Sequence, residues 1–524
     1  MAKVEVPQYE VWAFGSRAKW TAKDYSDLDL CVVADKPLSF TVLGAMAEDF
    51  SDSDLPWKVD VVDWATTSES FRKIIEQDKV VMQKSVEGRG MVGDYEEQEV
   101  EALLREGVLL INDGYRAKNS ELSNTGIPFA RAGNIDGGFH FKDVGRVPVH
   151  TLAKVGLKRS LPGDVVFTSK GTVGRFAFVR DGTPEFVYSP QLCYWRSGDV
   201  SRIHPRWLFY WMNGREFFLQ FKDVAGQTDM AEYVSLRDQR AMKITLPPLP
   251  EQKAIAAVLG ALDDKIELNR RMNATLEAMA RALFPSWFVD FDPVRAKLDG
   301  RSPAALDPAT AALFPEHLEE TALGHTPKGW DVRSLDKTAH YLNGLALQKY
   351  PPGDGPTLPV IKIAQLRKGD SVGADRCNTD LPPNYIVQDG DVLFSWSGSL
   401  EVELWCGGPG ALNQHLFKVT SPEFPKWFYY LWTLYHLDEF RLIAADKATT
   451  MGHIQRGHLT AAKVLIPPRP LLAAMSRTMS PLIDRLIANR IQSRTLATLR
   501  DTLLPKLLSW ELSVKSLHWE CIPC

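Results

Sequence analysis

Three aspartates near the start of the chain have the types and spacing that a metal-dependent phosphoryl-transfer site requires. Asp27 and Asp29 are two positions apart in an apolar run, so on a strand both side chains would point to the same face. Asp60, in a second apolar run, would complete the set from a neighbouring strand, and Asp63 is the less favoured alternative. Carboxylate oxygens are preferred ligands of Mg²⁺, and a two-metal site needs several of them.

Gly15 and Ser16 precede these carboxylates and supply a second part of the pattern. A Gly-Ser pair can turn tightly enough to offer backbone amides and a hydroxyl group to a triphosphate. With the three aspartates, this pattern over about residues 8–88 resembles the minimal nucleotidyltransferases of the DNA polymerase beta superfamily, which include antitoxin-like proteins that transfer AMP to a partner protein. The resemblance implies that the aspartates bind metal and act in catalysis, with Mg²⁺ and ATP as possible cofactors. Trp20 departs from the pattern, because many relatives carry glycine there, and an idle domain or one that only binds nucleotide is the alternative.

Most of the remaining sequence is a duplication, and a duplicated unit constrains the architecture more than any short motif. Residues 243–285 align without gaps with residues 463–505, so that Pro285 falls on Pro505. Near the start of each copy a Pro-Pro pair cannot continue a strand ladder. This pair therefore indicates that a globular unit ends there and that a long helix follows.

The apolar residues of both copies have the 3-4 spacing that is typical of a coiled-coil seam. Polar residues occupy two central seam positions in each copy, where a buried amide lowers stability but fixes register and partner. Two equivalent seams in one chain most simply pack against each other. The seam residues are Ile255, Leu259, Leu262, Ile266, Asn269, Asn273, Leu276, Ala280 and Leu283 in the first copy, and Met475, Met479, Leu482, Leu486, Asn489, Ser493, Leu496, Arg500 and Leu503 in the second.

The segments before the two helices also match, so each helix is predicted to follow a similar globular unit. Trp207 and Trp427 recur inside matching aromatic runs and are predicted to be core residues. Apolar runs bounded by glycine indicate short strands, so both units are predicted to mix helices and strands. The further matches are residues 163–167 with 390–394, residues 127–131 with 358–362, and Gln191 with Gln414.

Sequence runs around the first helix resemble a second known family. Residues 246–253, 286–294 and 326–330 are similar to the central conserved region of type I restriction–modification specificity subunits, and residues 498–508 are similar to their distal conserved helix. The likeness covers about residues 95–512. A long, ordered set of matches is far more specific than a single short motif.

This resemblance implies two target recognition domains held apart by an antiparallel helix pair, each domain reading one half of a split double-stranded DNA sequence. The helices would dock two methyltransferase subunits, and a translocating restriction subunit would join them. The specificity region would need no cofactor and catalyse nothing, which agrees with the sequence: Pro382-Pro-Asn-Tyr385 has the wrong order for a methyltransferase motif, and no Gly-Lys-Ser/Thr phosphate loop is present. The first helix rises roughly 42 Å between its outermost seam residues, comparable to the roughly 34–36 Å of one DNA turn.

Reading bases in a groove needs Arg, Lys, Asn or Gln side chains, with further donors to the phosphates. Several such residues lie in the matching loops of the two globular units. The candidates for DNA binding are Arg131, Asn134, Lys170 and Gln191 in the first unit, and Lys362, Gln365 and Gln414 in the second. The recognised bases do not follow from the sequence.

The predicted fold class is therefore a multidomain α+β protein. An N-terminal nucleotidyltransferase-like α/β domain is followed by two pseudo-repeated α+β target recognition domains separated by an antiparallel two-helix coiled coil. The expected boundaries are 1–90 for the nucleotidyltransferase-like domain, 95–250 for the first recognition domain, 251–294 for the central conserved helix, 295–325 for a linker, 326–468 for the second recognition domain, 469–509 for the distal conserved helix and 510–524 for a tail.

Composition places few limits on function. The chain has 524 residues, 45% hydrophobic and 24% charged, with a net charge of −4 and an isoelectric point near 6.3, so its overall charge does not favour nucleic-acid binding. A spanning apolar segment and a signal peptide are both missing, which predicts a cytoplasmic protein without a membrane partner. The six cysteines are too sparse and irregular for a disulfide framework, and Cys521 and Cys524 lack the second pair that a zinc site needs.

Two functions of different classes remain open. The first is a non-catalytic, DNA-binding specificity subunit, supported by the duplication. The second is an enzyme that transfers nucleotidyl groups, with the duplicated part as a docking platform. A duplicated helical scaffold that binds only protein is a further alternative.

Overall fold

The computed structural model describes residues 9–18, 27–34, 38, 46, 58–83, 95, 97–135, 138–170, 173–225, 233–446 and 452–514. The chain divides into two compact units, one formed by Met1–Ala256 with Leu504–Cys524 and the other by Ala257–Leu503. Trp20, Cys521 and Cys524, which the sequence singled out, lie outside the described residues. In the part of the chain that is described, no helix is both long and apolar enough to cross a bilayer.

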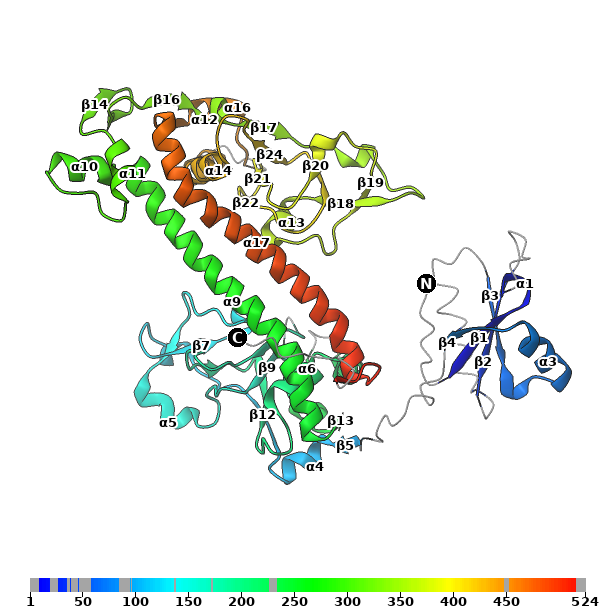
Figure 1. The fold of residues 1–524 in the computed structure, drawn as a ribbon. Helices are drawn as coiled ribbons and strands as arrows, with labels where there is room; N and C mark the ends of the chain where they lie inside the picture. The colour runs from blue at the N-terminus through cyan, green and yellow to red at the C-terminus, as the bar shows by residue number, and fades with distance from the viewer. Residues whose placement is uncertain are drawn as a thin grey trace. The chain divides into compact units, whose positions relative to one another are not determined.

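The N-terminal domain is a small sheet with a helix against it (Figure 1). The strands lie in the order β3-β2-β1-β4, with β1 antiparallel to both neighbours and β2 parallel to β3. Successive side chains of a strand point to opposite faces, so Val11 and Leu30 enter one apolar cluster while Trp12 and Cys31 enter the other with Ile75 of the helix α3. The elements are β1 (Glu10–Phe14), α1 (Gly15–Ala18), β2 (Leu28–Val33), β3 (Val59–Asp63), α3 (Glu69–Asp78) and β4 (Val80–Gln83).

The first repeat domain, residues 97–245, contains three small sheets. Their strand orders are β10-β9-β12-β6, β11-β7-β8 and β13-β5. The strands are β5 (Glu97–Glu99), β6 (Leu109–Asp113), β7 (Ile127–Ala130), β8 (Arg146–Val147), β9 (Val165–Thr168), β10 (Phe176–Phe178), β11 (Val187–Tyr188), β12 (Leu192–Ser197) and β13 (Lys243–Thr245). The helices are α4 (Val100–Arg105), α5 (Leu152–Val155), α6 (Pro205–Met212), α7 (Arg215–Ala225) and α8 (Leu236–Arg240).

The second repeat domain, residues 331–466, has the same plan. Its sheets have the orders β22-β21-β24-β17, β19-β18-β23-β20 and β25-β16. The strands are β16 (Asp331–Ser334), β17 (His340–Asn343), β18 (Thr357–Ile361), β19 (Arg376–Asn378), β20 (Ile386–Val387), β21 (Val392–Ser395), β22 (Val402–Leu404), β23 (Gly410–Leu412), β24 (Leu416–Thr420) and β25 (Lys463–Ile466). The helices are α12 (Leu335–Thr338), α13 (Ile363–Lys368), α14 (Lys426–Tyr435), α15 (Leu437–Asp446) and α16 (Arg456–Ala461).

Equivalent backbone contacts show that this likeness extends to single residues. In the first repeat domain a Cβ atom on Gly114 would lie 1.9 Å from the carbonyl oxygen of Ser189. In the second, a Cβ atom on Gly344 would lie 2.2 Å from that of Asn413. Both approaches are too close for any side chain, so each domain requires glycine directly after the edge strand β6 or β17.

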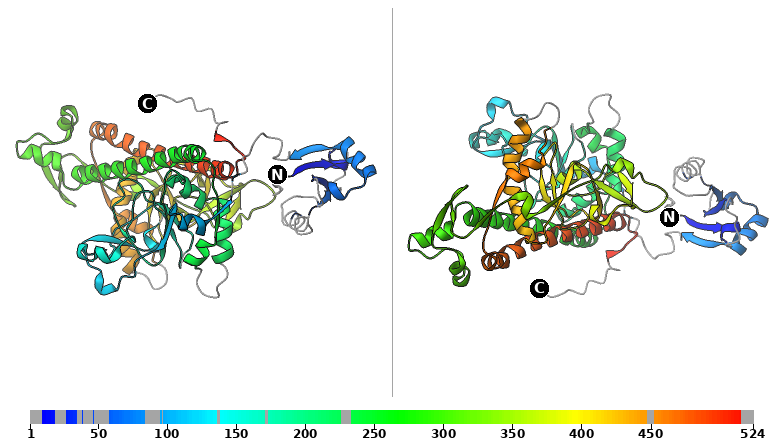
Figure 2. Two further views of the ribbon diagram at one scale, coloured as in Figure 1. Left: turned by 90° about the horizontal axis from the view of Figure 1, so that it is seen from below. Right: turned by 90° about the horizontal axis from the view of Figure 1, so that it is seen from above.

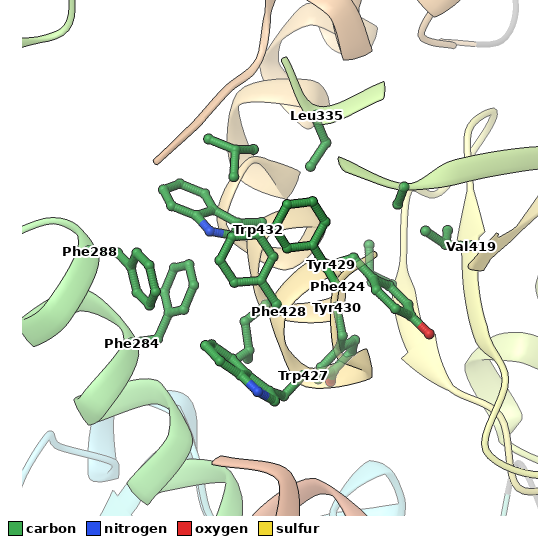
Figure 3. Close-up of a cluster of buried hydrophobic side chains, with 14 of the residues drawn as sticks. Phe284, Phe288, Leu335, Val419, Phe424, Trp427, Phe428, Tyr429, Tyr430 and Trp432 are labelled. Atoms are coloured by element: carbon green, nitrogen blue, oxygen red, sulfur yellow. The ribbon is translucent and has the colours of Figure 1, made fainter. Parts of the chain in front are cut away.

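The core of the second repeat domain is strongly aromatic (Figure 3). Trp427 of α14 is fully buried and donates through its indole nitrogen to Ser476 Oγ at 3.0 Å. Trp432, one turn further on, meets Phe284 edge-on with ring centroids 5.0 Å apart. Trp207 is 1% exposed in the equivalent helix α6. The prediction that Trp207 and Trp427 are core residues is confirmed.

Two helices of 40 residues follow the repeat domains: α9 (Leu249–Phe288) and α17 (Arg469–Leu508). Both views of Figure 2 show them side by side, as Figure 1 does. Asp263 Oδ1 accepts from Arg500 at 2.8 Å, and Asn273 Oδ1 accepts from Asn489 at 2.9 Å. Numbers rise along one helix as they fall along the other, so the predicted antiparallel pairing is confirmed.

The three asparagines among the four polar seam residues are buried, and all four residues are bonded across the helix pair. Asn269 is fully buried, and its Nδ2 donates to Gln492 Oε1 at 2.9 Å and to Ser493 Oγ at 3.3 Å. Asn489 is 1% exposed. A slip in register would leave these amides without partners in the interior, so they fix the alignment of the two helices.

The segment expected to be a linker, 295–325, contains regular structure. It includes the end of α10 (Asp292–Leu298), the helix α11 (Pro308–Leu313), the strand β14 (Leu318–Thr321) and the start of β15 (Gly324–Pro327), which pairs with β14. Phe314 is 2% exposed and packs beside Trp330. The segment therefore adds its own apolar contacts to the core.

Candidate functional site

The four candidate residues of the first repeat domain gather where β7, β9 and β12 end or begin. Asn134 Oδ1 accepts from the Arg131 backbone amide at 2.8 Å, and Gln191 Oε1 accepts from the Ala132 amide at 3.3 Å. Lys170 lies two residues after the end of β9, and its Nζ is 5.9 Å from the ring centroid of Tyr233. Arg131, Lys170 and Gln191 are exposed, so their donors can reach a ligand outside the domain.

The candidates of the second repeat domain occupy a similar edge. Gln365 Oε1 accepts from the Lys362 backbone amide at 3.3 Å, as Asn134 does for Arg131. Lys362 also forms an ion pair with Asp375. Gln414 lies between β23 and β24, and its Nε2 is 3.4 Å from His415 Nε2. At each edge, a basic residue and an amide side chain cap one helical turn. A glutamine from a loop lies at the same edge.

The structure corrects the predicted match of Gln191 with Gln414 by one residue. The Ser169 amide donates to the carbonyl oxygen of Gln191 at 3.0 Å, and the equivalent Trp396 amide donates to that of His415 at 3.3 Å. The counterpart of Gln191 is therefore His415, and Gln414 corresponds to Pro190. Both loops contain a glutamine within one position, so the sequences alone favoured the wrong alignment.

Sequence reasoning also missed polar and aromatic residues at these edges. Trp396, His415 and His453 lie together in the second domain, with ring centroids 5.9 Å apart for Trp396 and His415 and 6.4 Å apart for Trp396 and His453. In the first domain, Tyr233 occupies the position of His453. Lys170 forms an isolated antiparallel β-bridge with Tyr233, and the equivalent Ser397 forms one with His453. These residue types differ between the repeats, so comparing the two copies gave no signal for them.

The N-terminal carboxylates come together on β2 and β3. Asp29 and Asp60 lie opposite each other in the parallel ladder. The pKa of Asp29 is raised, first by burial and then by the negative charges of Asp60 and Asp27, so all three carboxylates share one electrostatic neighbourhood. Gly15 has φ +77°, and a Cβ atom there would lie 2.4 Å from Asp29 Oδ2. The turn containing Gly15 therefore rests directly on the carboxylate, with Ser16 next in α1.

Asp60 and the alternative ligand Asp63 have different surroundings. Lys58 Nζ lies 2.7 Å from Asp60 Oδ1, and both side chains are largely exposed. Asp63 is buried, its Oδ1 accepts from the Ala65 amide and its Oδ2 from the Leu38 amide, both at 2.9 Å. Asp63 therefore caps a short helical turn, while Asp60 is exposed to solvent and pairs with the exposed Lys58.

Within the described ranges, no three carboxylate, imidazole or thiol groups lie close enough to enclose a metal ion as they stand. The residues nevertheless fit a divalent cation in their chemistry. The donors are all oxygen atoms, and after burial the negative charges of Asp60 and Asp27 contribute to the raised pKa of Asp29, so a cation near the three carboxylates would be favoured. Asp60 would have to exchange Lys58 for the ion, which costs little because exposed ion pairs are weak.

Comparison with known proteins separates the chain into two parts. The family described as "Polymerase beta, Nucleotidyltransferase" matches residues 8–87, and the "Type I restriction modification DNA specificity domain" matches residues 106–278. Over 79 residues the chain is 58% identical to the probable protein adenylyltransferase MntA of Haemophilus influenzae. The matched segment covers 15% of this chain and 69% of that protein.

The larger part resembles proteins of one kind. The chain is 26% identical over 322 residues to the type I restriction enzyme MjaIX specificity subunit of Methanocaldococcus jannaschii, covering 59% of this chain and 70% of that protein. It is 22% identical over 408 residues to the HindI specificity subunit of Haemophilus influenzae, covering 69% of this chain and 88% of that protein.

Two repeat domains on one plan, each followed by a helix of an antiparallel pair, define a DNA-specificity protein with a separate nucleotidyltransferase domain. The chain belongs to the specificity subunits of type I restriction–modification systems. Its N-terminal domain belongs to the polymerase beta nucleotidyltransferases.

Proposed function

We propose that this subunit reads a bipartite double-stranded DNA target, with one repeat domain on each half. The observation that carries the proposal is the shared plan of the two domains, which places a basic residue, an amide and a loop glutamine or histidine at the same edge twice. Such side chains suit base edges and phosphates. The DNA-contacting residues would be Arg131, Asn134, Lys170, Gln191, Lys362, Gln365 and Gln414.

The helix pair would serve as the docking platform for the other subunits. Specificity subunits of this family assemble with methyltransferase and restriction subunits, and two similar helices offer two similar outer faces. We therefore propose two methyltransferase subunits, with one restriction subunit that translocates DNA. The repeat domains and helices would catalyse nothing themselves.

Methylation mapping tests this proposal. The chain is produced with the methyltransferase subunit encoded beside it, the complex is isolated by a tag on this chain, and modified adenines are mapped in the DNA of the host. The expected result is co-purification and methylation at one split sequence. Methylation independent of sequence, or none, would contradict the proposal.

The N-terminal domain supports a second function of a different class. We propose that it transfers AMP from ATP to a partner protein with release of pyrophosphate, since its carboxylates and glycine turn lie together and its relative MntA is described as a probable protein adenylyltransferase. Asp27, Asp29 and Asp60 would hold Mg²⁺, which would neutralise phosphate charge and activate the attacking oxygen. Gly15 and Ser16 would bind the triphosphate.

Labelled ATP tests the second function. The full chain, with the proteins that co-purify with it, is incubated with labelled ATP and Mg²⁺, beside the double variant Asp27→Asn plus Asp29→Asn. Asparagine keeps the shape but removes the negative charges that bind metal, so label transfer should disappear. Transfer that survives in the variant would assign the activity to other residues, and no transfer to any protein would indicate an idle domain.

A further inference from the structure

The backbone of Gln414 hydrogen-bonds to two other segments of the second repeat domain. Its backbone amide donates to the carbonyl oxygen of Leu345 at 2.9 Å, and its own carbonyl oxygen accepts from Trp396 Nε1 at 3.2 Å. The same indole nitrogen donates to Asn343 Oδ1 at 2.9 Å. Both ends of the residue are thus attached to neighbouring segments, at the edge where β17, β21 and β24 meet (Figure 1).

The side-chain amide of Gln414 is oriented by a chain of hydrogen bonds. Its Nε2 lies 3.4 Å from His415 Nε2, and His415 Nδ1 lies 2.9 Å from Ser397 Oγ. An amide nitrogen can only donate, so His415 Nε2 must accept. The proton of the imidazole then lies on Nδ1 and is donated to the Ser397 hydroxyl. Among the residues that the structure describes, none hydrogen-bonds to the second Nε2 hydrogen or to the side-chain oxygen Oε1 of Gln414.

A free N–H beside a free carbonyl oxygen is the pair that binds adenine in the major groove. The carbonyl oxygen accepts from the N6 amino group, and the N–H donates to N7. We infer that Gln414 reads an adenine in the half of the target bound by the second repeat domain, with Trp396 and the Ser397–His415 chain as its positioning residues. The inference rests on the proposed reading of split DNA.

Among the described residues of the first repeat domain, no equivalent arrangement occurs. Pro190 stands in place of Gln414, and the nearby Gln191 spends its carbonyl oxygen on the Ala132 amide at 3.3 Å. An amide whose oxygen is already used cannot bind adenine through both atoms. The arrangement around Gln414 therefore serves only the half of the target that the second repeat domain would bind.

Binding of base analogues tests the inference on the assembled complex. The target is mapped first, and duplexes are made in which each adenine of each half is replaced in turn by 7-deazaadenine, which lacks the N7 acceptor. For the wild type, one position in one half should weaken binding about 10-fold, as expected for loss of a specific base contact. In Gln414→Ala that sensitivity should vanish, while binding of unrelated DNA stays unchanged.

His415→Ala provides the test of positioning, and His325→Ala, an exposed histidine on β15, is its matched control. His415→Ala should reduce the 7-deazaadenine effect to about 3-fold or less and leave the circular dichroism spectrum unaltered, whereas His325→Ala should change neither. Full retention of the effect in Gln414→Ala overturns the inference, as does its full retention in a folded His415→Ala protein. A wild type that recognises no split sequence overturns the proposed function itself.

Discussion

The ion pair between Asp263 and Arg500 offers the sharpest test of how the helix pair is held together. The pair occurs only once in the duplicated seam. In the internal repeat, Ile483 corresponds to Asp263 and Ala280 corresponds to Arg500. Ala280 and Ile483 are 3% and 2% exposed, so the equivalent layer is apolar and buried. Asp263→Ile with Arg500→Ala would therefore convert the charged layer into a copy of an apolar layer that the chain already contains.

The exposure of the two side chains sets the magnitude. Breaking a fully buried pair costs about 3–5 kcal/mol and an exposed pair contributes about 0–1 kcal/mol. The Asp263 side chain is 9% exposed and the Arg500 side chain 31% exposed, so Arg500→Ala should destabilise the helix pair by about 2 kcal/mol. The double variant should lie within about 1 kcal/mol of the wild type, because an apolar layer of similar volume replaces a buried ion pair at little cost.

Hydrogen exchange of the helix amides measures this difference locally, since a multidomain chain does not unfold in one step. A loss of about 2 kcal/mol corresponds to about 30-fold faster exchange in α9 and α17. Arg270→Ala is the matched control, because Arg270 is 61% exposed and pairs with Glu267 on its own helix. The reasoning is refuted if Arg500→Ala exchanges like Arg270→Ala, or if the double variant is as unstable as both single changes added together.

Three further predictions concern the glycines and the carboxylates. Gly344→Ala and Gly114→Ala should each unfold their own repeat domain, seen as lost protection from hydrogen exchange, whereas Gly457→Ala, with open space around its Cβ position, should not. Gly15→Ala should abolish label transfer from ATP without unfolding the repeat domains, because its Cβ atom would meet Asp29 and its φ of +77° suits glycine only. Because the pKa of Asp29 is raised, protons should displace Mg²⁺ at a higher pH than at an ordinary aspartate, so affinity measured by calorimetry should fall on mild acidification; a flat profile would contradict this.

The duplication made much of the architecture predictable. Seam spacing predicted the paired helices, and polar seam positions such as Asn269 and Asn489 are indeed buried. The fold class is confirmed as α+β repeats with an antiparallel helix pair and a nucleotidyltransferase domain. These features follow from periodicity and repetition, which a sequence displays directly.

Other features depend on contacts that no local pattern encodes. The orientation of Gln414 depends on His415 beside it and on Trp396 and Ser397, which follow β21 and are distant from Gln414 in the sequence. The segment 295–325 is rich in alanine, proline and polar residues, so composition gave no sign that Phe314 is a core residue.

Each repeat domain begins and ends on the same short ladder, β5 with β13 in the first and β16 with β25 in the second. Entry and exit of the chain are therefore separated by roughly 5 Å, the spacing of adjacent strands. Each repeat domain is therefore attached to the rest of the chain at one place, through two adjacent strands. Recombination at the two strands could exchange one entire domain for another, giving a new DNA target while the helices and their seam are inherited unchanged.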